Sequence, residues 1–467
     1  MRNIRMVVGV AVIAVAATVT AKDYPLTFKK LTVDEAMAFP GGYGAYGSLS
    51  TSKPSSLRKE PTAVSKRPLY GEVGRNGEEV KGFIFRVDES EGDGKGYDQV
   101  IVDFNQNGDL TDDSVGNLAG KPQTVKTGTT VRETIQFGPI EVPAEKQIGS
   151  WRPVYYAQMI YYSNRVLLVS GANLPYLGQF RLKPGWYLET TVDLDGRQQK
   201  VGVVDGDANL HLGDVSKPET YTSGAEENWY FPPADSYLQD RDGSGKFENN
   251  AINTESSPFG SMLYFGATPY RATLAEDYAS LRVEPWPDAL AELRIQPQGE
   301  QVGDVFLAWK TQANDWVLLK AGVAQGTTKV PPGNLRFYGC VLAAQSPGNE
   351  LLMIGGSYRK LGRTVKAQAD QTATLCCGPP LEMKVSTLKR DMSDLSSTLD
   401  LSSEDNESAG PMSDVVLQIR AQLVGVAGEI YSAFATGKSL SDEPPKPHFA
   451  VLTKEGRTVV SGNLEFG

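Results

Sequence analysis

The sequence predicts an all-β protein with an N-terminal antiparallel β domain and one or two β-sandwiches after it. The first observation is a series of short runs rich in Val, Ile, Tyr and Phe, which end at Gly, Pro, Asn or Asp. The second is the 48 glycines and 28 prolines among 467 residues, above the usual ~7% and ~5%. The third is the absence of a helical stripe of apolar residues from the N-terminal half. At ~150 residues per domain, the length allows about three domains.

Residues 1–21 are predicted to be a signal peptide that is removed on export. Arg2 and Arg5 give a positive start, an apolar run spans residues 6–19, and small residues precede a cleavage site after Ala21. As a helix the run reaches only ~21 Å, short of the ~30 Å hydrocarbon core, although an uncleaved membrane anchor is the alternative. The mature protein is therefore expected in the periplasm or outside the cell, without a membrane span.

Residues 22–68 are predicted to be an extended arm or linker. Thr32 and Glu35 have the spacing of a capping box before a short helical turn. The stretch at residues 53–68 is basic and punctuated by prolines, which is typical of a solvated linker. In an acidic protein, this stretch could instead lie across the body of the molecule.

The β domain is predicted at residues 69–283, where strand-like runs follow one another with polar turns between them. An immunoglobulin-like arrangement of two sheets is predicted at residues 284–380, because seven short runs with turns every 8–12 residues are typical of sandwich domains. Residues 381–467 are expected to form a second sandwich or an extension of the first. They contain a Ser/Asp-rich loop at residues 393–413.

An acidic loop at residues 103–113 carries the strongest local signal. Side-chain oxygens occupy alternate positions 1, 3 and 5, a glycine at position 6 permits a sharp turn, and position 7 can offer its carbonyl. Two further carboxylates could complete the six to eight oxygens that calcium takes. The predicted ligands are Asp103, Asn105, Asn107, Asp109, Asp112 and Asp113.

The pattern recurs twice further along the chain. One loop keeps the three oxygens but has Leu210 where glycine is expected, and its predicted ligands are Asp205, Asp207, Asn209 and Asp214. The other keeps the glycine, and its predicted ligands are Asp240, Asp242, Ser244, Lys246 and Glu248. Each loop alone could be an ordinary Asx turn. Three such loops, each after a strand-like run, favour calcium ions that act as structural clips.

The three loops resemble the calcium loops of EF-hands and dockerins, although Ser114 stands where a bidentate Glu is expected and the first loop follows a strand. The turn at residues 330–333 resembles the one in carboxypeptidase-regulatory-like and transthyretin-like sandwiches. Together these features resemble exported bacterial proteins of unknown activity that join such loops to C-terminal immunoglobulin-like sandwiches. The resemblance implies calcium loops set in a β domain, and it implies no activity.

The three cysteines leave a disulfide open. Alternation along the run at residues 372–377 turns either Cys376 or Cys377 inward, so Cys340 could pair with the inward one if the strands are neighbours. Three small, buried thiols are the alternative.

Composition argues against several classes of function. The net charge of −10 does not favour nucleic acid or an anionic membrane as a partner, and two histidines with three cysteines do not favour zinc or copper sites. The catalytic signatures HExxH, GxSxG and CxxC are absent from the sequence. We therefore expect an exported, calcium-stabilised structural or binding protein of the cell envelope without catalytic residues, with an envelope protein or a glycan as partner. The alternatives are a polysaccharide hydrolase with a carboxylate pair and a carbohydrate-binding module.

Overall fold

The computed structural model describes residues 21–74, 82–92, 96–127, 130–163, 166–169, 172–175, 177–194, 196–223, 226–248, 255–266, 268–296, 301–311, 314–321, 326–345, 351–357, 364–378, 380–391, 415–426, 428–436, 448–452 and 456–463. Within them, one α-helix, α1 (Val33–Ala38), and one short 3-10 helix, η1 (Ala144–Lys146), accompany a chain that is otherwise strands and turns. The predicted all-β class is therefore confirmed. No helix in this part of the chain combines the length and the apolar character needed to cross a membrane.

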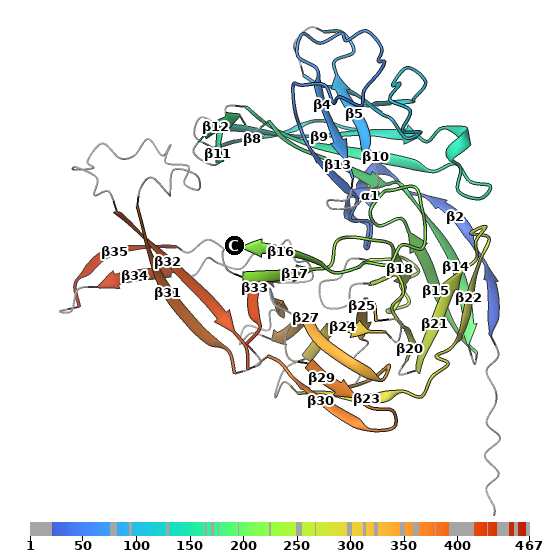
Figure 1. Ribbon diagram of the computed structural model, residues 1–467, viewed down its shortest axis with the longest axis vertical. Coiled ribbons are helices and arrows are strands. Elements are labelled where there is room, and N and C mark those ends of the chain that lie inside the picture. Colours follow the sequence, from blue (N-terminus) through green and yellow to red (C-terminus); the bar gives the residue numbers. More distant parts are fainter. Residues whose placement is uncertain are drawn as a thin grey trace, which may run out of the picture.

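Four antiparallel sheets and two hairpins form the N-terminal body at residues 22–285 (Figure 1). One sheet holds, in spatial order, β4 (Leu69–Val73), β5 (Phe83–Asp88), β6 (Gln99–Val102) and β7 (Val115–Asn117). Another holds β3 (Ala45–Ser48), β13 (Gly178–Pro184), β10 (Val154–Ser163), β9 (Thr130–Glu141) and β8 (Gln123–Thr127). A third holds β19 (Ser256–Pro258), β18 (Ser236–Gln239), β15 (Arg197–Val204), β14 (Trp186–Leu194) and β2 (Thr27–Lys30). The fourth holds β1 (Lys22–Pro25), β22 (Ser280–Pro285), β21 (Thr268–Leu274) and β20 (Leu263–Phe265), and the hairpins are β11 (Val166–Val169) with β12 (Ala172–Pro175) and β16 (Glu219–Ser223) with β17 (Glu226–Tyr230).

A single hydrophobic core receives side chains from all four of these sheets. Because successive side chains of a strand point to opposite faces, every second residue of each strand can enter this core. Phe85 of β5 stacks on Phe180 of β13 with their ring centroids 3.9 Å apart, and Trp186 of β14 is fully buried. The shared core fixes the positions of the strand ends from which the acidic loops leave.

The segment at residues 22–68 is built into the body instead of forming a separate arm. Strands β1, β2 and β3 pair with β22, β14 and β13, so the segment adds an edge strand to three different sheets. The capping box starts α1 as the sequence predicts, with the backbone N–H of Thr32 donating to Glu35 Oε2 at 2.8 Å.

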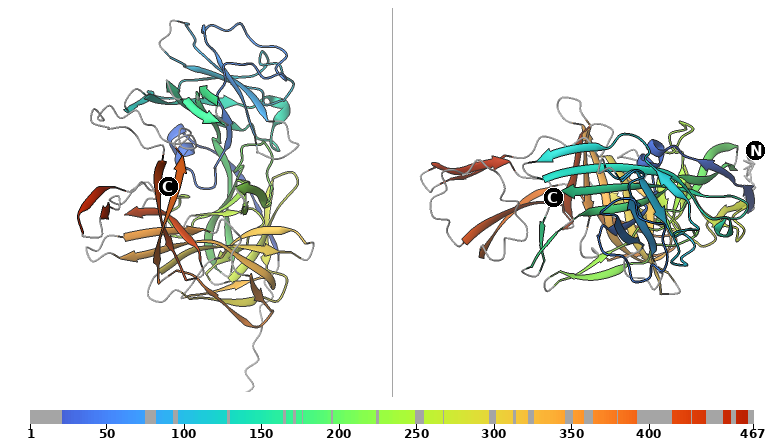
Figure 2. Two further views of the ribbon diagram at one scale, coloured as in Figure 1. Left: turned by 60° about the vertical axis from the view of Figure 1, so that its left-hand side comes forward. Right: turned by 90° about the horizontal axis from the view of Figure 1, so that it is seen from above.

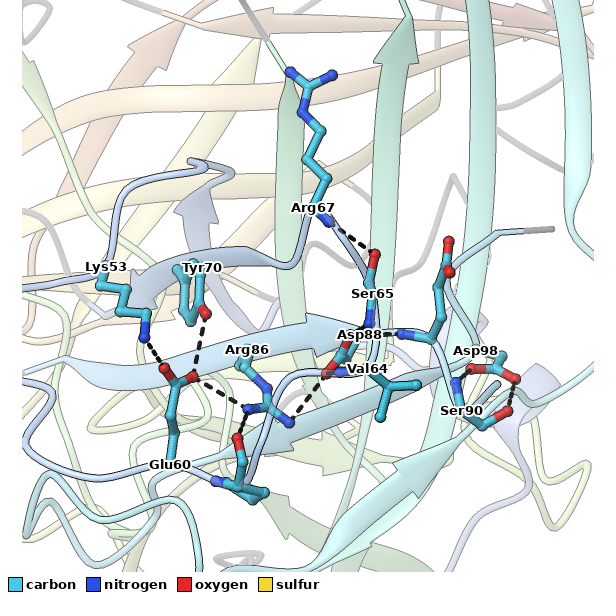
Figure 3. Close-up of polar contacts among 12 residues, drawn as sticks. Lys53, Glu60, Val64, Ser65, Arg67, Tyr70, Arg86, Asp88, Ser90 and Asp98 are labelled. Atoms are coloured by element: carbon cyan, nitrogen blue, oxygen red, sulfur yellow. Dashed lines mark hydrogen bonds and ion pairs between the residues drawn. The ribbon is translucent and has the colours of Figure 1, made fainter. Parts of the chain in front are cut away.

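The basic, proline-spaced stretch at residues 53–68 lies across the body and is held there by Arg86 of β5 (Figure 3). The guanidinium of Arg86 is buried, with Nη1 at 3.1 Å from Glu60 Oε2 and Nη2 at 3.2 Å from Asp88 Oδ2. It also donates to the carbonyl of Pro61. A β-strand side chain therefore contacts the stretch through both an ion pair and a backbone carbonyl.

The two carboxylates around Arg86 make further contacts with the stretch and with β4. Asp88 accepts the backbone N–H groups of Val64 at 3.1 Å and Ser65 at 2.8 Å. Glu60 pairs with Lys53 and accepts the Tyr70 hydroxyl at 3.2 Å. Burial alone would raise the pKa of Glu60, but the hydrogen bonds from Lys53 and Arg86 hold it below its ordinary value. The network thus fixes the stretch through charge as well as through backbone hydrogen bonds.

Two further sheets enclose a second core in the C-terminal part and form a sandwich. The smaller sheet holds β26 (Thr327–Val330), β23 (Ala291–Gln296) and β30 (Thr372–Cys376), the last two parallel to each other. The larger holds β25 (Trp316–Ala321), β24 (Gln301–Lys310), β27 (Gly333–Gln345), β28 (Leu351–Ser357), β33 (Ile430–Thr436), β32 (Val415–Val424) and β31 (Glu382–Asp391), with β29 (Thr364–Ala367) paired to β27. Strands β31, β32 and β33 thus extend the larger sheet, and the Ser/Asp-rich loop at residues 393–413 lies outside the described residues, as does the predicted signal peptide apart from Ala21. Figures 1 and 2 show β31 and β32 extending from the rest of the larger sheet on the side of the molecule where the hairpin of β34 (His448–Leu452) and β35 (Thr458–Asn463) lies.

The cysteines lie in the C-terminal sandwich with their thiols free. Cys340 and Cys377 are buried in the same core, whereas Cys376 is exposed. A hydrogen bond with the Cys340 thiol, together with burial, raises the pKa of the Cys377 thiol. The inward neighbour is therefore Cys377, and its thiol lies beside that of Cys340 without a disulfide between them.

Candidate cation-binding sites

Each of the three acidic loops begins at the residue that follows a strand. Asp103 follows β6, Asp205 follows β15 and Asp240 follows β18. In each loop, this first carboxylate accepts the backbone N–H of position 6, at 2.8 Å from Gly108, 3.1 Å from Leu210 and 2.9 Å from Gly245. The sequence repeat therefore corresponds to one repeated local structure.

The backbone of position 6 is left-handed in all three loops. Its φ is 77° at Gly108, 69° at Leu210 and 81° at Gly245. This region suits glycine, and a leucine there costs of order 1–3 kcal/mol of backbone strain. The loop after β15 thus keeps its shape although Leu210 replaces the expected glycine, so the surrounding contacts impose the turn.

The loop after β15 contributes to a buried group of three carboxylates. Side-chain oxygens of Asp205, Asp207 and Asp235 all lie within 4.8 Å of one another. Their residues are 0%, 6% and 1% exposed. The register explains the meeting, because Val204 at the end of β15 pairs with Ser236 at the start of β18, which places the flanking aspartates side by side.

Uncharged donors surround two of these three carboxylates. Asp205 accepts the Tyr155 hydroxyl at 2.5 Å and the backbone N–H groups of Asn209 and Leu210 at 3.1 Å each. Asp235 accepts three backbone N–H groups, from Gly206 at 3.0 Å, Gly213 at 2.6 Å and Asp214 at 2.8 Å. Hydrogen bonds of this kind orient the carboxylates without neutralising them.

Burial sets the electrostatics of this group. It raises the pKa of Asp205 to about 6. Burial and the neighbouring charges of Asp205 and Asp207 raise the pKa of Asp235 well above its ordinary value. Ionised carboxylates are costly to bury unless they are paired or coordinate a metal. A divalent cation at this point would remove that cost, and the three residues could hold one.

The loop after β18 contributes to a second group, formed by Asp240, Asp242 and Glu255, whose oxygens also lie within 4.8 Å of one another. Asp240 and Glu255 are buried, and Asp242 is exposed. Asp240 Oδ2 accepts Gly245 N–H, but its buried Oδ1 has no hydrogen-bond partner in the described part of the chain. This group could hold a cation that enters from the side of Asp242.

Glu255 takes the place that the sequence gives to Glu248. The Glu248 side chain is exposed, and its backbone N–H donates to Glu255 Oε2 at 2.8 Å. The carbonyl of Lys246 accepts the Ser244 hydroxyl at 3.3 Å. Burial raises the pKa of Glu255, whereas the N–H of Ser244 lowers the pKa of Asp242.

The loop after β6 is outside both groups. Asp109 pairs with Lys59 at 2.8 Å, and this contact lowers its pKa to about 2. Burial raises the pKa of Asp113 to about 7, and the charges of Asp103 and Asp112 add to the effect. The loop thus brings Asp103, Asp112 and Asp113 into one electrostatic neighbourhood but directs Asp109 to residues 53–68.

The remaining predicted ligands bind neighbours within their own loops. The side-chain amide of Asn107 donates to Asp112 at 2.8 Å, and that of Asn105 does so at 3.4 Å. The amide of Asn209 donates to Asp214 at 2.5 Å. These residues shape the loops, and their role as metal ligands stays a prediction.

Asp235 and Glu255 are the members of the two groups that the loop pattern does not contain. Each directly precedes a strand of the same sheet, β18 for Asp235 and β19 for Glu255. Since β18 lies between β15 and β19, the start of each strand meets the loop that leaves its neighbour. The signal in the sequence is an acidic residue directly before a strand that comes after an acidic loop: the next strand for Glu255, and the strand beyond the β16–β17 hairpin for Asp235.

No protein-family model, curated protein or solved structure matches the chain.

Proposed function

We propose that the protein is an exported structural or binding protein whose N-terminal body is stabilised by bound calcium. The observation that carries the proposal is the buried group of Asp205, Asp207 and Asp235, three carboxylates that converge within 4.8 Å. Export is proposed on the predicted signal peptide at residues 1–21. It would place the sites where calcium is abundant.

The donor set favours a hard cation over the transition metals. Both groups offer only carboxylate oxygens, which suit calcium, magnesium and manganese, whereas zinc and copper favour imidazole and thiolate. Calcium accepts irregular shells of six to eight oxygens with waters among them, and magnesium demands an almost ideal octahedron. Carboxylates whose positions are fixed by strand ends and backbone N–H groups therefore suit calcium better than magnesium.

The expected size of the effect supports a structural role. Extracellular calcium modules often bind with a Kd of 10⁻⁴–10⁻³ M. At roughly 1 mM calcium and a Kd of about 0.1 mM, one site adds about 1.4 kcal/mol to the free energy of unfolding. Two sites add about 3 kcal/mol, a large fraction of the usual ~5–15 kcal/mol. Calcium would therefore matter for stability without taking part in a reaction.

Terbium luminescence tests the first group directly. Terbium binds the same oxygen ligands as calcium and is excited through nearby aromatic rings, and the Tyr155 hydroxyl is hydrogen-bonded to Asp205. We expect terbium added to the metal-free protein to become luminescent and millimolar calcium to displace it. Asp235→Asn should remove most of the signal.

Asp288→Asn is the matched control, because Asp288 is an exposed aspartate outside both groups. This variant should leave the terbium signal and its displacement unchanged. A signal that survives Asp235→Asn, or that calcium does not displace, would contradict the proposed site.

A further inference from the structure

The second carboxylate group lies beside the contact between the N-terminal body and the C-terminal sandwich. We propose that a divalent cation bound by Asp240, Asp242 and Glu255 fastens the sandwich to the body. The inference rests on the proposed function, because it requires that the protein binds calcium. Arg241 follows Asp240 in the chain and Ser256 follows Glu255, and both residues contact the sandwich.

The buried carboxylate of Asp240 is the feature that indicates a cation in this group. This residue is 6% exposed, and its Oδ1 is buried without a hydrogen-bond partner in the described part of the chain. The same carboxylate belongs to the group whose oxygens converge within 4.8 Å. An unsatisfied buried oxygen costs free energy. A cation bound between Asp240, Asp242 and Glu255 would satisfy it.

The first link to the sandwich runs through Arg241. Its backbone N–H donates to Glu255 Oε1 at 2.7 Å, so its position depends on that carboxylate. Its guanidinium Nη1 lies 3.2 Å from Asp304 Oδ1 on β24. Asp304 is 1% exposed, so this ion pair is shielded from water.

The second link runs through Ser256, the residue after Glu255. Its carbonyl accepts Lys320 Nζ of β25 at 2.9 Å, and the same Nζ lies 3.0 Å from Asp304 Oδ2. The backbone N–H of Lys320 donates to Ser261 Oγ at 2.9 Å. Arg241 and Ser256 therefore contact the same buried ion pair of the sandwich, that of Lys320 with Asp304.

Cation binding and attachment should consequently depend on each other. Without a cation, mutual repulsion of the carboxylates drives residues 240–242 away from Glu255 and disturbs both links. The apolar contact of Phe231 with Ala308 and Leu318 does not involve the loop, so it would still hold the two parts together. The cation then controls how rigidly the sandwich is attached.

Hydrogen exchange at the Lys320 amide is the readout, because this N–H crosses the junction to Ser261. We expect calcium to slow its exchange in the full chain at least tenfold. Asp240→Asn should abolish the slowing, and Asp288→Asn should retain it. Calcium binding is measured by calorimetry on the same samples.

Arg241→Met provides a second variant that leaves all three carboxylates in place. It should still bind calcium at both groups, but calcium should slow exchange at Lys320 less than in the wild type, because only the link through Ser256 remains. This variant decides the question if Asp240→Asn does not fold.

The outcomes separate the two proposals. If calcium binds to the wild-type chain but exchange at Lys320 does not change, the fastening is wrong and the proposed function stands. If calcium slows exchange in Arg241→Met as much as in the wild type, the link through Arg241 is wrong. If calcium does not bind at all, both proposals are overturned.

Discussion

Replacing Arg86 by methionine is expected to lower the free energy of unfolding by about 3–5 kcal/mol. Methionine keeps the apolar stem but removes the charge that lies between Glu60 and Asp88. Both carboxylates then lose their buried partner, and uncompensated buried charge is strongly destabilising. Since Glu60 belongs to residues 53–68 and Asp88 binds the backbone N–H groups of Val64 and Ser65, this stretch should detach from the body as well.

Equilibrium unfolding in urea measures the loss, and limited proteolysis within residues 53–68 reports the detachment. Arg282→Met is the control, because Arg282 is an exposed arginine of β22 whose carboxylate contacts are 3.7 Å or longer. Surface pairs of this kind are worth about 0–1 kcal/mol. If the two substitutions cost the same, the network of Figure 3 does not anchor the stretch.

Removing calcium with a chelator is expected to lower the free energy of unfolding by about 3 kcal/mol relative to 1 mM calcium. The loss comes from the two groups around Asp205 and Asp240, which bind calcium in the folded chain only, because unfolding separates their carboxylates. Thermal unfolding with a chelator, with calcium and with magnesium measures the effect. Magnesium should restore less of the stability than calcium does.

Asp235→Asn should destabilise the protein more in calcium than with the chelator. In calcium the variant loses a ligand and should be less stable than the wild type. With the chelator it loses no metal ligand, and the amide weakens only hydrogen bonds from the backbone N–H groups of Gly206, Gly213 and Asp214, so the loss should be smaller than in calcium. The same destabilisation in both conditions would indicate a packing effect of the substitution and no cation.

The strand content and the acidic loops could be predicted from the sequence because both are local patterns. Alternating apolar residues lead to strands, and the positions of Asp103, Asp205 and Asp240 follow from spacing alone. The structure shows that even Leu210 adopts the left-handed backbone of the two glycines. The loop therefore forms with a leucine at position 6, although the left-handed backbone there favours glycine.

What could not be predicted depends on which strands are neighbours. Asp235 and Glu255 join the two groups only because β18 lies between β15 and β19. The order of strands in a sheet cannot be deduced from the spacing of residues within each strand. The segment at residues 22–68, predicted to be an arm, also depends on distant partners. Its prolines and basic residues are typical of a linker, but the partners that fix it, Arg86 among them, are distant in the sequence.

Calorimetric titration of calcium into the metal-free full chain tests the central claim most directly. The account predicts saturable binding at millimolar calcium or below, with one site lost in Asp235→Asn and a different one lost in Asp240→Asn. Titrations that show no binding, or binding that both variants leave intact, would contradict it.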